Sequence, residues 1–88
     1  MPTAEPVSGL SAIAAGNVRA LRAKARLRQE DVARRAGMSR AVLASLETER
    51  RRVTLDDAAA LCAGLGVTLS DLLEGAPPQA LEALGLNE

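Results

Sequence analysis

A three-residue turn near the middle of the chain, Gly37–Met38–Ser39, constrains the fold more than any other feature. It separates two short segments, 29–36 and 40–48, whose apolar residues recur at helical spacing. These inward residues are Val32, Ala33 and Ala36 in the first segment and Leu43 and Leu46 in the second. Glycine tolerates the left-handed backbone that ends a helix, and serine caps the helix that follows. Two short helices can therefore converge on a shared core if they cross steeply, with the small Ala33 near the crossing point.

The rest of the chain also carries helical patterns. An apolar stripe predicts a first helix over 11–27, with Asn17 as an alternative, later N-cap. Two capping boxes, each a threonine followed three residues later by an aspartate, predict further helices that begin at residues 55 and 69. The capping pairs are Thr54–Asp57 and Thr68–Asp71, and the expected ends are Gly64 and Gly66 for one helix and Glu74 for the other.

The patterns predict one all-α domain, because no segment alternates with the period of a strand. We expect five helices, and residues 79–84 leave room for a short sixth helix near the C-terminus. Residues 1–9 are expected to form a flexible leader, 10–75 the folded domain and 76–88 a tail. The leucines of the tail, Leu81, Leu84 and Leu86, either cover the core of their own chain or meet a second subunit.

The charges of the chain are strongly segregated, although its formal net charge is zero. All eleven basic residues lie between Arg19 and Arg52, together with only four acidic residues, which gives that segment a net charge of +7. The sequence outside it carries seven acidic residues and no basic one. A polyanion would therefore meet a strongly positive central segment.

Several chemistries are excluded by composition. Histidine, tryptophan, tyrosine and phenylalanine are absent, and Cys62 is the one cysteine. The chain therefore lacks the ligand set of a zinc finger, the imidazole of histidine-dependent acid–base catalysis and the second thiol of a disulfide. We predict no catalytic site, no metal and no cofactor. Because no apolar run approaches the length of a membrane span, we expect a cytoplasmic protein without a membrane contact.

Burial of Leu43 and Leu46 would turn one narrow side of the second short helix outward. The residues on that side are Arg40, Ala41, Ala44 and Ser45. Such a slim surface fits deep in the major groove of a DNA duplex. Arg40 can donate two hydrogen bonds to a guanine edge, the two alanines can touch thymine methyl groups, and Ser45 can hydrogen-bond several base edges.

Other polar residues flank this side and are predicted to bind phosphates. They are Gln29, Ser39, Arg50, Arg51 and Arg52. Gln29 begins a helix, where free backbone N–H groups also favour an anion. The three arginines follow the second short helix, within reach of a flanking DNA strand.

Residues 17–73 resemble the Cro/repressor-type helix-turn-helix domain of phage repressors and small bacterial regulators. The resemblance is carried by Gln29, Ala33, Gly37, Ser39, Leu43, Leu46, Glu47, the LGV of residues 65–67 and the LL of residues 72–73. It implies a five-helix, lambda-repressor-like fold, phosphate contacts by Gln29 and the loop of residues 50–52, and base contacts by Arg40, Ala41 and Ser45. It also implies a structural pair between Arg22 on the first helix and Glu47 at the end of the third.

Three positions depart from the family pattern. Arg26 and Glu49 stand where the family usually has glycine, and Arg28 stands where it usually has a capping serine or threonine. Loss of a cap costs about 1 kcal/mol, so the fold is expected to survive. A carboxylate at position 49 is unfavourable next to the expected phosphates.

Two functions follow from these observations. The first is a sequence-specific regulator of transcription that binds double-stranded DNA, acting as a homodimer on a palindromic operator, because one short helix reads only a few base pairs. The alternative is a protein-interaction module on the same fold, such as an antitoxin or an anti-activator. The acidic tail and the plain outer side of the 40–48 helix favour that alternative.

Overall fold

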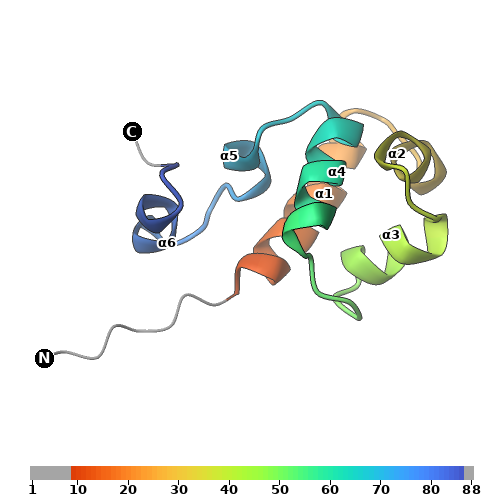
Figure 1. Cartoon of the computed structure of the whole chain (residues 1–88). Helices are drawn as coiled ribbons and strands as arrows, with labels where there is room; N and C mark the ends of the chain where they lie inside the picture. The colour runs from red at the N-terminus through yellow and green to blue at the C-terminus, as the bar shows by residue number, and fades with distance from the viewer. Residues whose placement is uncertain (1–8, 87–88) are drawn as a thin grey trace, which may run out of the picture.

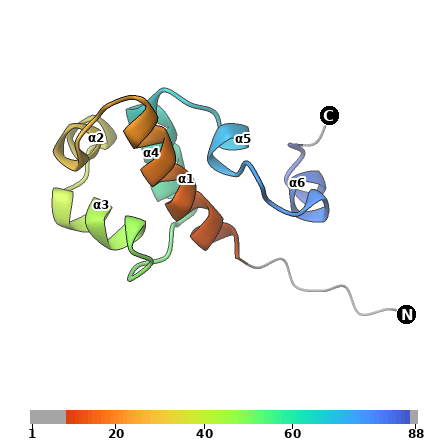
Figure 2. The same ribbon diagram turned by 180° about the vertical axis from the view of Figure 1, so that it is seen from behind.

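The computed structural model describes residues 9–86, which form six helices and no strand. The helices are α1 (Leu10–Lys24), α2 (Gln29–Ala36), α3 (Arg40–Glu47), α4 (Leu55–Leu65), α5 (Leu69–Leu72) and α6 (Pro78–Ala83). α1 and α4 occupy the middle of the molecule, α2 and α3 lie at one end, and α5 and α6 lie at the other (Figure 1, Figure 2). The predicted all-α fold is confirmed, and the short sixth helix is present.

The core lies where α1, α2, α3 and α4 pack against one another. Val32, Leu43, Leu46 and Leu61 are completely or almost completely buried in it. Gly64 does not close α4, contrary to the sequence prediction, but lies inside that helix and is buried against α2. A Cβ atom on Gly64 would lie 3.1 Å from the backbone nitrogen of Ala36 and 3.2 Å from the carbonyl oxygen of Val32. A small residue here lets the two helices approach closely.

The first three helices end in the same way. In each, the residue after a left-handed residue donates its backbone N–H back into the last turn of the helix. These hydrogen bonds are Leu27 to Arg22, Met38 to Ala33 and Arg50 to Ser45. The left-handed residues are Arg26 (φ 58°), Gly37 (φ 70°) and Glu49 (φ 62°). The predicted end of the first helix at residue 27 is three residues too late, because the reversal begins after Lys24, whereas α3 ends at Glu47, within one residue of the expected end.

The N-caps are largely those that the sequence predicts. The side chains of Ser39, Thr54 and Thr68 each accept a hydrogen bond from the backbone N–H three residues later. Asn17 is not a cap, since it lies inside α1 and its Nδ2 donates to the carbonyl oxygens of Leu72 (2.7 Å) and Glu74 (2.9 Å). Leu72 is the last residue of α5, which does not continue to Glu74 as predicted, and Glu74 lies in the turn that follows.

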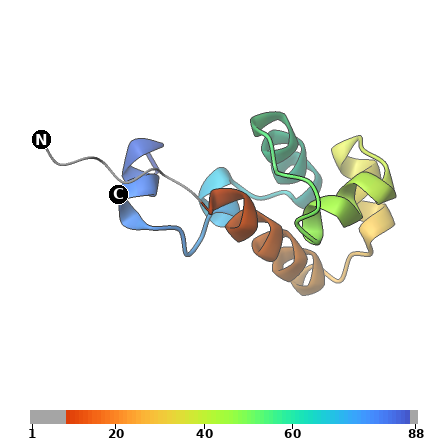
Figure 3. The same ribbon diagram turned by 90° about the horizontal axis from the view of Figure 1, so that it is seen from below.

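α6 stands apart from the other helices (Figure 3). Ala80 is buried and Leu81 and Leu86 pack against the core, whereas the side chain of Leu84 is 43% exposed. The tail thus covers part of its own core and leaves an apolar edge. Of the predicted leader, the structure describes only Gly9, which is the N-cap of α1, and the rest lies outside the described residues. Within residues 9–86, no helix has the length and hydropathy of a membrane span.

Candidate nucleic-acid interface

α3 presents its predicted outer side to solvent. Leu43 and Leu46 are buried on the opposite side, Arg40 and Ala41 are exposed, and Ala44 and Ser45 are half-buried. α3 lies at the edge of the molecule, at the end away from α6 (Figure 1). The structure therefore brings the four predicted base-reading residues together on one accessible surface.

Ser39 fixes the start of that surface. Its Oγ accepts a hydrogen bond from the backbone N–H of Val42 at 3.1 Å, and its side chain is exposed. The oxygen is thus occupied by the cap, while the hydroxyl hydrogen remains available for an acceptor such as a phosphate.

A cleft of about 360 Å³ lies between the starts of α2 and α3. Its lining residues are Arg22, Leu27, Arg28, Gln29, Glu30 and Arg40. Three of the six are arginines, and α2 adds the positive end of its dipole. The lining of the cleft is therefore net positive, with Glu30 as its one carboxylate.

The buried carboxylate of Glu47 fixes two of the residues that line this cleft, Arg22 and Gln29. Glu47 is 2% exposed, and its two oxygens accept hydrogen bonds from Arg22 Nε (2.9 Å), Arg22 Nη2 (3.0 Å) and Gln29 Nε2 (3.1 Å). Arg22 Nη1 also donates to the carbonyl oxygen of Leu27 at 3.2 Å, and Arg19 donates to the carbonyl oxygen of Glu47. One acidic group thereby ties α1, α2 and α3 together. The predicted pairing of Arg22 with Glu47 is present in the structure.

Gln29 has an internal partner that sequence reasoning did not foresee. Its side-chain amide carries two N–H groups, and one of them is used by Glu47. The second is available to a phosphate. The spacing of Gln29 and Glu47 in the sequence gave no sign of this contact, because it depends on how steeply α2 and α3 cross.

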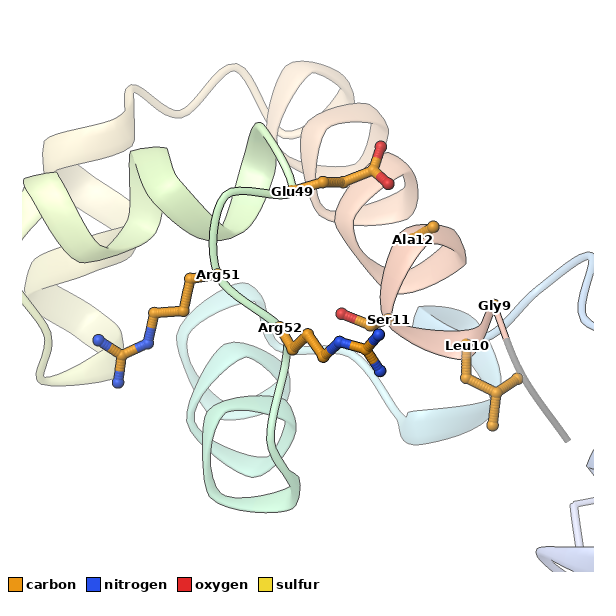
Figure 4. Close-up of a pocket in the computed structure, with 7 residues that line it drawn as sticks. All are labelled: Gly9, Leu10, Ser11, Ala12, Glu49, Arg51 and Arg52. Atoms are coloured by element: carbon orange, nitrogen blue, oxygen red, sulfur yellow. The ribbon is translucent and has the colours of Figure 1, made fainter.

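The loop between α3 and α4 carries the other predicted phosphate contacts. Arg50, Arg51 and Arg52 are all exposed. Two of them, with Glu49 and the first residues of α1, line a shallow cavity of about 430 Å³ (Figure 4). Arg52 extends toward Ser11, whereas Arg51 points to the other side of the loop (Figure 4). The loop itself is tied to α1, because the backbone N–H of Val53 donates to Ser11 Oγ at 2.8 Å.

The acidic residues of α2 are engaged locally. The pKa of Asp31 is lowered, chiefly by the hydrogen bond from the backbone N–H of Arg28; desolvation opposes this shift, and the charges of Arg28 and Arg34 lower the pKa further. Asp31 thus remains ionised and neutralises part of the basic charge at the start of α2. Its oxygens lie 3.5 Å from Arg28 Nε and 3.2 Å from Arg34 Nη2.

Within the described residues, nothing resembles a metal site or an activated nucleophile. No group of three cysteine or acidic side chains is placed to hold a metal ion there. Cys62 is half-buried against the core, and the pKa of its thiol is raised, mainly by burial and also by the charge of Asp71. A thiol with a raised pKa is a weaker nucleophile at neutral pH.

Comparisons with known proteins agree with this geometry. A sequence model of the helix-turn-helix family matches residues 18–72. A hypothetical transcription factor, NHTF from Neisseria, shares 32% identity over 96% of this chain and 95% of its own, with a TM-score of 0.69. The clp gene regulator ClgR from Corynebacterium glutamicum shares 27% identity over 91% of this chain and 86% of its own, with a TM-score of 0.71.

A third solved structure is also similar. The restriction-modification controller protein C.AhdI from Aeromonas hydrophila shares 26% identity over 70% of this chain and 94% of its own, with a TM-score of 0.66. No curated protein sequence matches the chain.

Proposed function

The chain belongs to the Cro/repressor-type helix-turn-helix family of DNA-binding transcriptional regulators, and we propose that it reads a specific duplex sequence as a homodimer, with α3 in the major groove. One observation carries this proposal. Arg40, Ala41, Ala44 and Ser45 form an accessible surface on α3, which begins at a cleft also lined by Arg22 and Arg28 and ends at a loop with three further arginines.

Base reading would fall mainly to Arg40. It is the one long side chain among the four outer residues and lies at the first position of α3, where an arginine can donate two hydrogen bonds to guanine. Ala41 and Ala44 offer methyl contacts to thymine, and Ser45 offers a hydroxyl group. With so few polar readers, the shape of the duplex would contribute to the choice of site.

Phosphate contacts would position the subunit on the duplex. We assign them to Gln29 and Ser39 on one side of α3 and to Arg50, Arg51 and Arg52 on the other. In this arrangement Ala33 and Gly37 set the crossing of α2 and α3, and Arg22 and Glu47 fix it.

A homodimer would double the length of the site that is read. Two-fold related subunits fit a palindromic operator whose half-sites lie about 34 Å apart. Residues 10–75 would be the DNA-binding domain and the tail from residue 76 the dimerisation element. The apolar edge near α6 supports this assignment, because Leu55 is 82% exposed and Leu84 is 43% exposed beside a groove of about 180 Å³.

Such a dimer would act in the cytoplasm by occupying its operator. The bound dimer would exclude polymerase from an overlapping promoter, which gives repression, or would lie beside polymerase and contact it, which gives activation. Neither outcome needs an enzymatic step or a cofactor.

Salt dependence of DNA binding tests the proposal. Fluorescence polarisation with a labelled 20-base-pair duplex would be measured between about 50 and 200 mM salt, a range over which phosphate contacts weaken strongly. Neutralising one phosphate with each of Arg50, Arg51 and Arg52 gives a slope of log affinity against log salt of about −2.7 per subunit. Binding that does not change with salt would contradict the proposal.

Sequence reading is tested with Arg40→Ala and a matched control, Arg35→Ala on α2. On a duplex selected from genomic fragments, R40A should lose about 1–3 kcal/mol of binding free energy and tolerate more sequences. R35A should keep the preference of the wild type. An equal loss on random DNA would reassign Arg40 to the DNA backbone.

The apolar edge of Leu55 and Leu84 would also fit the alternative function, a protein-interaction module. If that edge receives a different protein, the purified chain should be monomeric by sedimentation and should fail to shift DNA even at low salt. A dimer that shifts DNA would decide against this alternative.

A further inference from the structure

Arg28 occupies the N-cap position of α2, where a serine or threonine would accept a hydrogen bond from the helix. The backbone N–H of Arg28 donates to Asp31 Oδ2 at 3.0 Å, so half of a capping box is kept. The other half is lost, because no side-chain atom at position 28 caps the first turn. Arginine is therefore a poor choice for the helix itself.

Arg28 is one of the residues that line the cleft between α2 and α3. Its side chain is 77% exposed, with Nη1 3.1 Å from Glu30 Oε1 and Nε 3.5 Å from Asp31 Oδ2. It lines the cleft together with Arg22, Gln29 and Arg40. The two carboxylates thus hold the positive charge of Arg28 over the first turn of α2.

We propose that Arg28 is a phosphate-binding residue of the DNA interface and that Glu30 holds its guanidinium group in place until a phosphate replaces the carboxylate. The inference rests on the proposed function, and it adds a contact that neither the family resemblance nor the motif assigns. An arginine fork matches the geometry of a phosphate, and the positive end of α2 favours the same anion.

The exchange of carboxylate for phosphate is favourable for a simple reason. An ion pair between exposed side chains contributes little, because water screens it and ordering both side chains costs entropy. DNA offers a dense line of phosphates, and each neutralised phosphate releases bound counterions. Glu30 therefore orients Arg28 without competing strongly against DNA.

Arg28→Ser separates a contact with DNA from a role in the fold, because the two predict opposite changes. Serine restores the missing cap, so the variant should melt at a higher temperature than the wild type. It also removes a phosphate contact, so affinity for a random 20-base-pair duplex should fall about three- to tenfold at 50 mM salt. The slope of log affinity against log salt should become shallower by about 0.9.

Arg35→Ser is the matched control, since Arg35 is exposed in the last turn of the same helix. It should leave both the affinity and the salt slope close to those of the wild type. If R28S keeps the wild-type affinity and slope, the assignment of Arg28 is overturned and the proposed function stands. If the wild type shows no salt-dependent binding to the duplex, the proposed function fails and this inference fails with it.

Glu30→Gln tests the role of the carboxylate. Removing its charge should raise the affinity about threefold, and part of that gain should vanish in the R28S background because the guanidinium group is no longer there to be released. An equal gain in both backgrounds would show that Glu30 acts on DNA directly and does not hold Arg28.

Discussion

Replacing Glu49 by glycine should raise both the stability and the DNA affinity of this protein, for two separable reasons. Glu49 has a φ of 62° at the end of α3, a conformation that costs a residue with a Cβ atom about 1–2 kcal/mol. Glycine adopts it freely but also gains about 0.4–1 kcal/mol of entropy in the unfolded chain. The net stabilisation expected for E49G is therefore about 0.5–1 kcal/mol.

The effect on binding comes from charge. If the loop after α3 faces phosphates, the carboxylate of Glu49 would repel them, and we take a separation of about 8 Å, the screening length at physiological salt. A pair of like charges at that distance in water repels by about 0.5 kcal/mol, so its removal should raise the affinity about twofold. Salt at 0.15 M should reduce this gain, because the screening length falls there to about 8 Å, which equals the assumed separation.

Glu49→Gln separates the two effects. It keeps the side chain in the left-handed conformation and removes the charge, so it should match E49G in affinity but not in stability. Unfolding is followed by circular dichroism of the helices, since the chain contains no tryptophan or tyrosine. E49G should melt about 2–8 °C above the wild type, the shift that this free energy gives in a domain of this size.

Each result can refute one part of the reasoning. If E49G is no more stable than E49Q, the left-handed residue is not strained. If neither variant binds a random duplex more tightly than the wild type at low salt, the loop after α3 does not face phosphates.

Three further perturbations test the framework that positions the interface. Gly64→Ala should lower the free energy of unfolding by about 1 kcal/mol, because overpacking against the backbone of α2 outweighs the gain in helix propensity. Gly16→Ala, on the open side of α1, should raise it by about 0.5–1 kcal/mol. Equal effects of the two substitutions in urea unfolding would refute the close packing of α4 against α2. Arg22→Ala leaves the carboxylate of Glu47 buried without its charged partner and should lower the free energy of unfolding by about 3 kcal/mol. A loss below about 1 kcal/mol would show that water reaches this carboxylate. Asp71 has a pKa below its ordinary value of 3.8, mainly because the backbone N–H of Thr68 donates to its carboxylate. The ionised carboxylate therefore stabilises the fold above pH 3.8, and this stabilisation is lost as the pH falls below that value. As the pH is lowered below 3.8, the melting temperature of D71N should decline less than that of the wild type.

Much of the fold could be predicted because local signals determine it. The turn at residues 37–39 and the threonine caps place the boundaries of α2, α3 and α4 to within a residue or two. Gly64 shows where such signals mislead. A glycine near the end of a helix indicates a stop, yet this one is required by the approach of α2, and a contact between segments that are distant in the sequence leaves no local pattern.

The candidate site was predicted in part for the same reason. The spacing of Arg40, Ala41, Ala44 and Ser45 determines which side of α3 they share, once Leu43 and Leu46 are buried. The contact between Gln29 and Glu47 depends on the crossing of two helices, and the position of Arg28 in the cleft depends on the exact entry of α2. Neither could be read from spacing along the chain.

The departures from the family pattern acquire a physical meaning when the ends of α1, α2 and α3 are compared. All three helices close with the same backbone hydrogen bonds, yet the left-handed residue is glycine only at Gly37 and is charged at Arg26 and Glu49. The conformation is therefore imposed by the closure of the helix and not by the residue that adopts it. Neither charge is needed for the turn, and Arg28 is not needed for its cap, so the fold does not account for these side chains. Arg28 lines the basic cleft, where the proposed phosphate contact gives it a role, whereas Glu49 in the loop after α3 opposes such a contact.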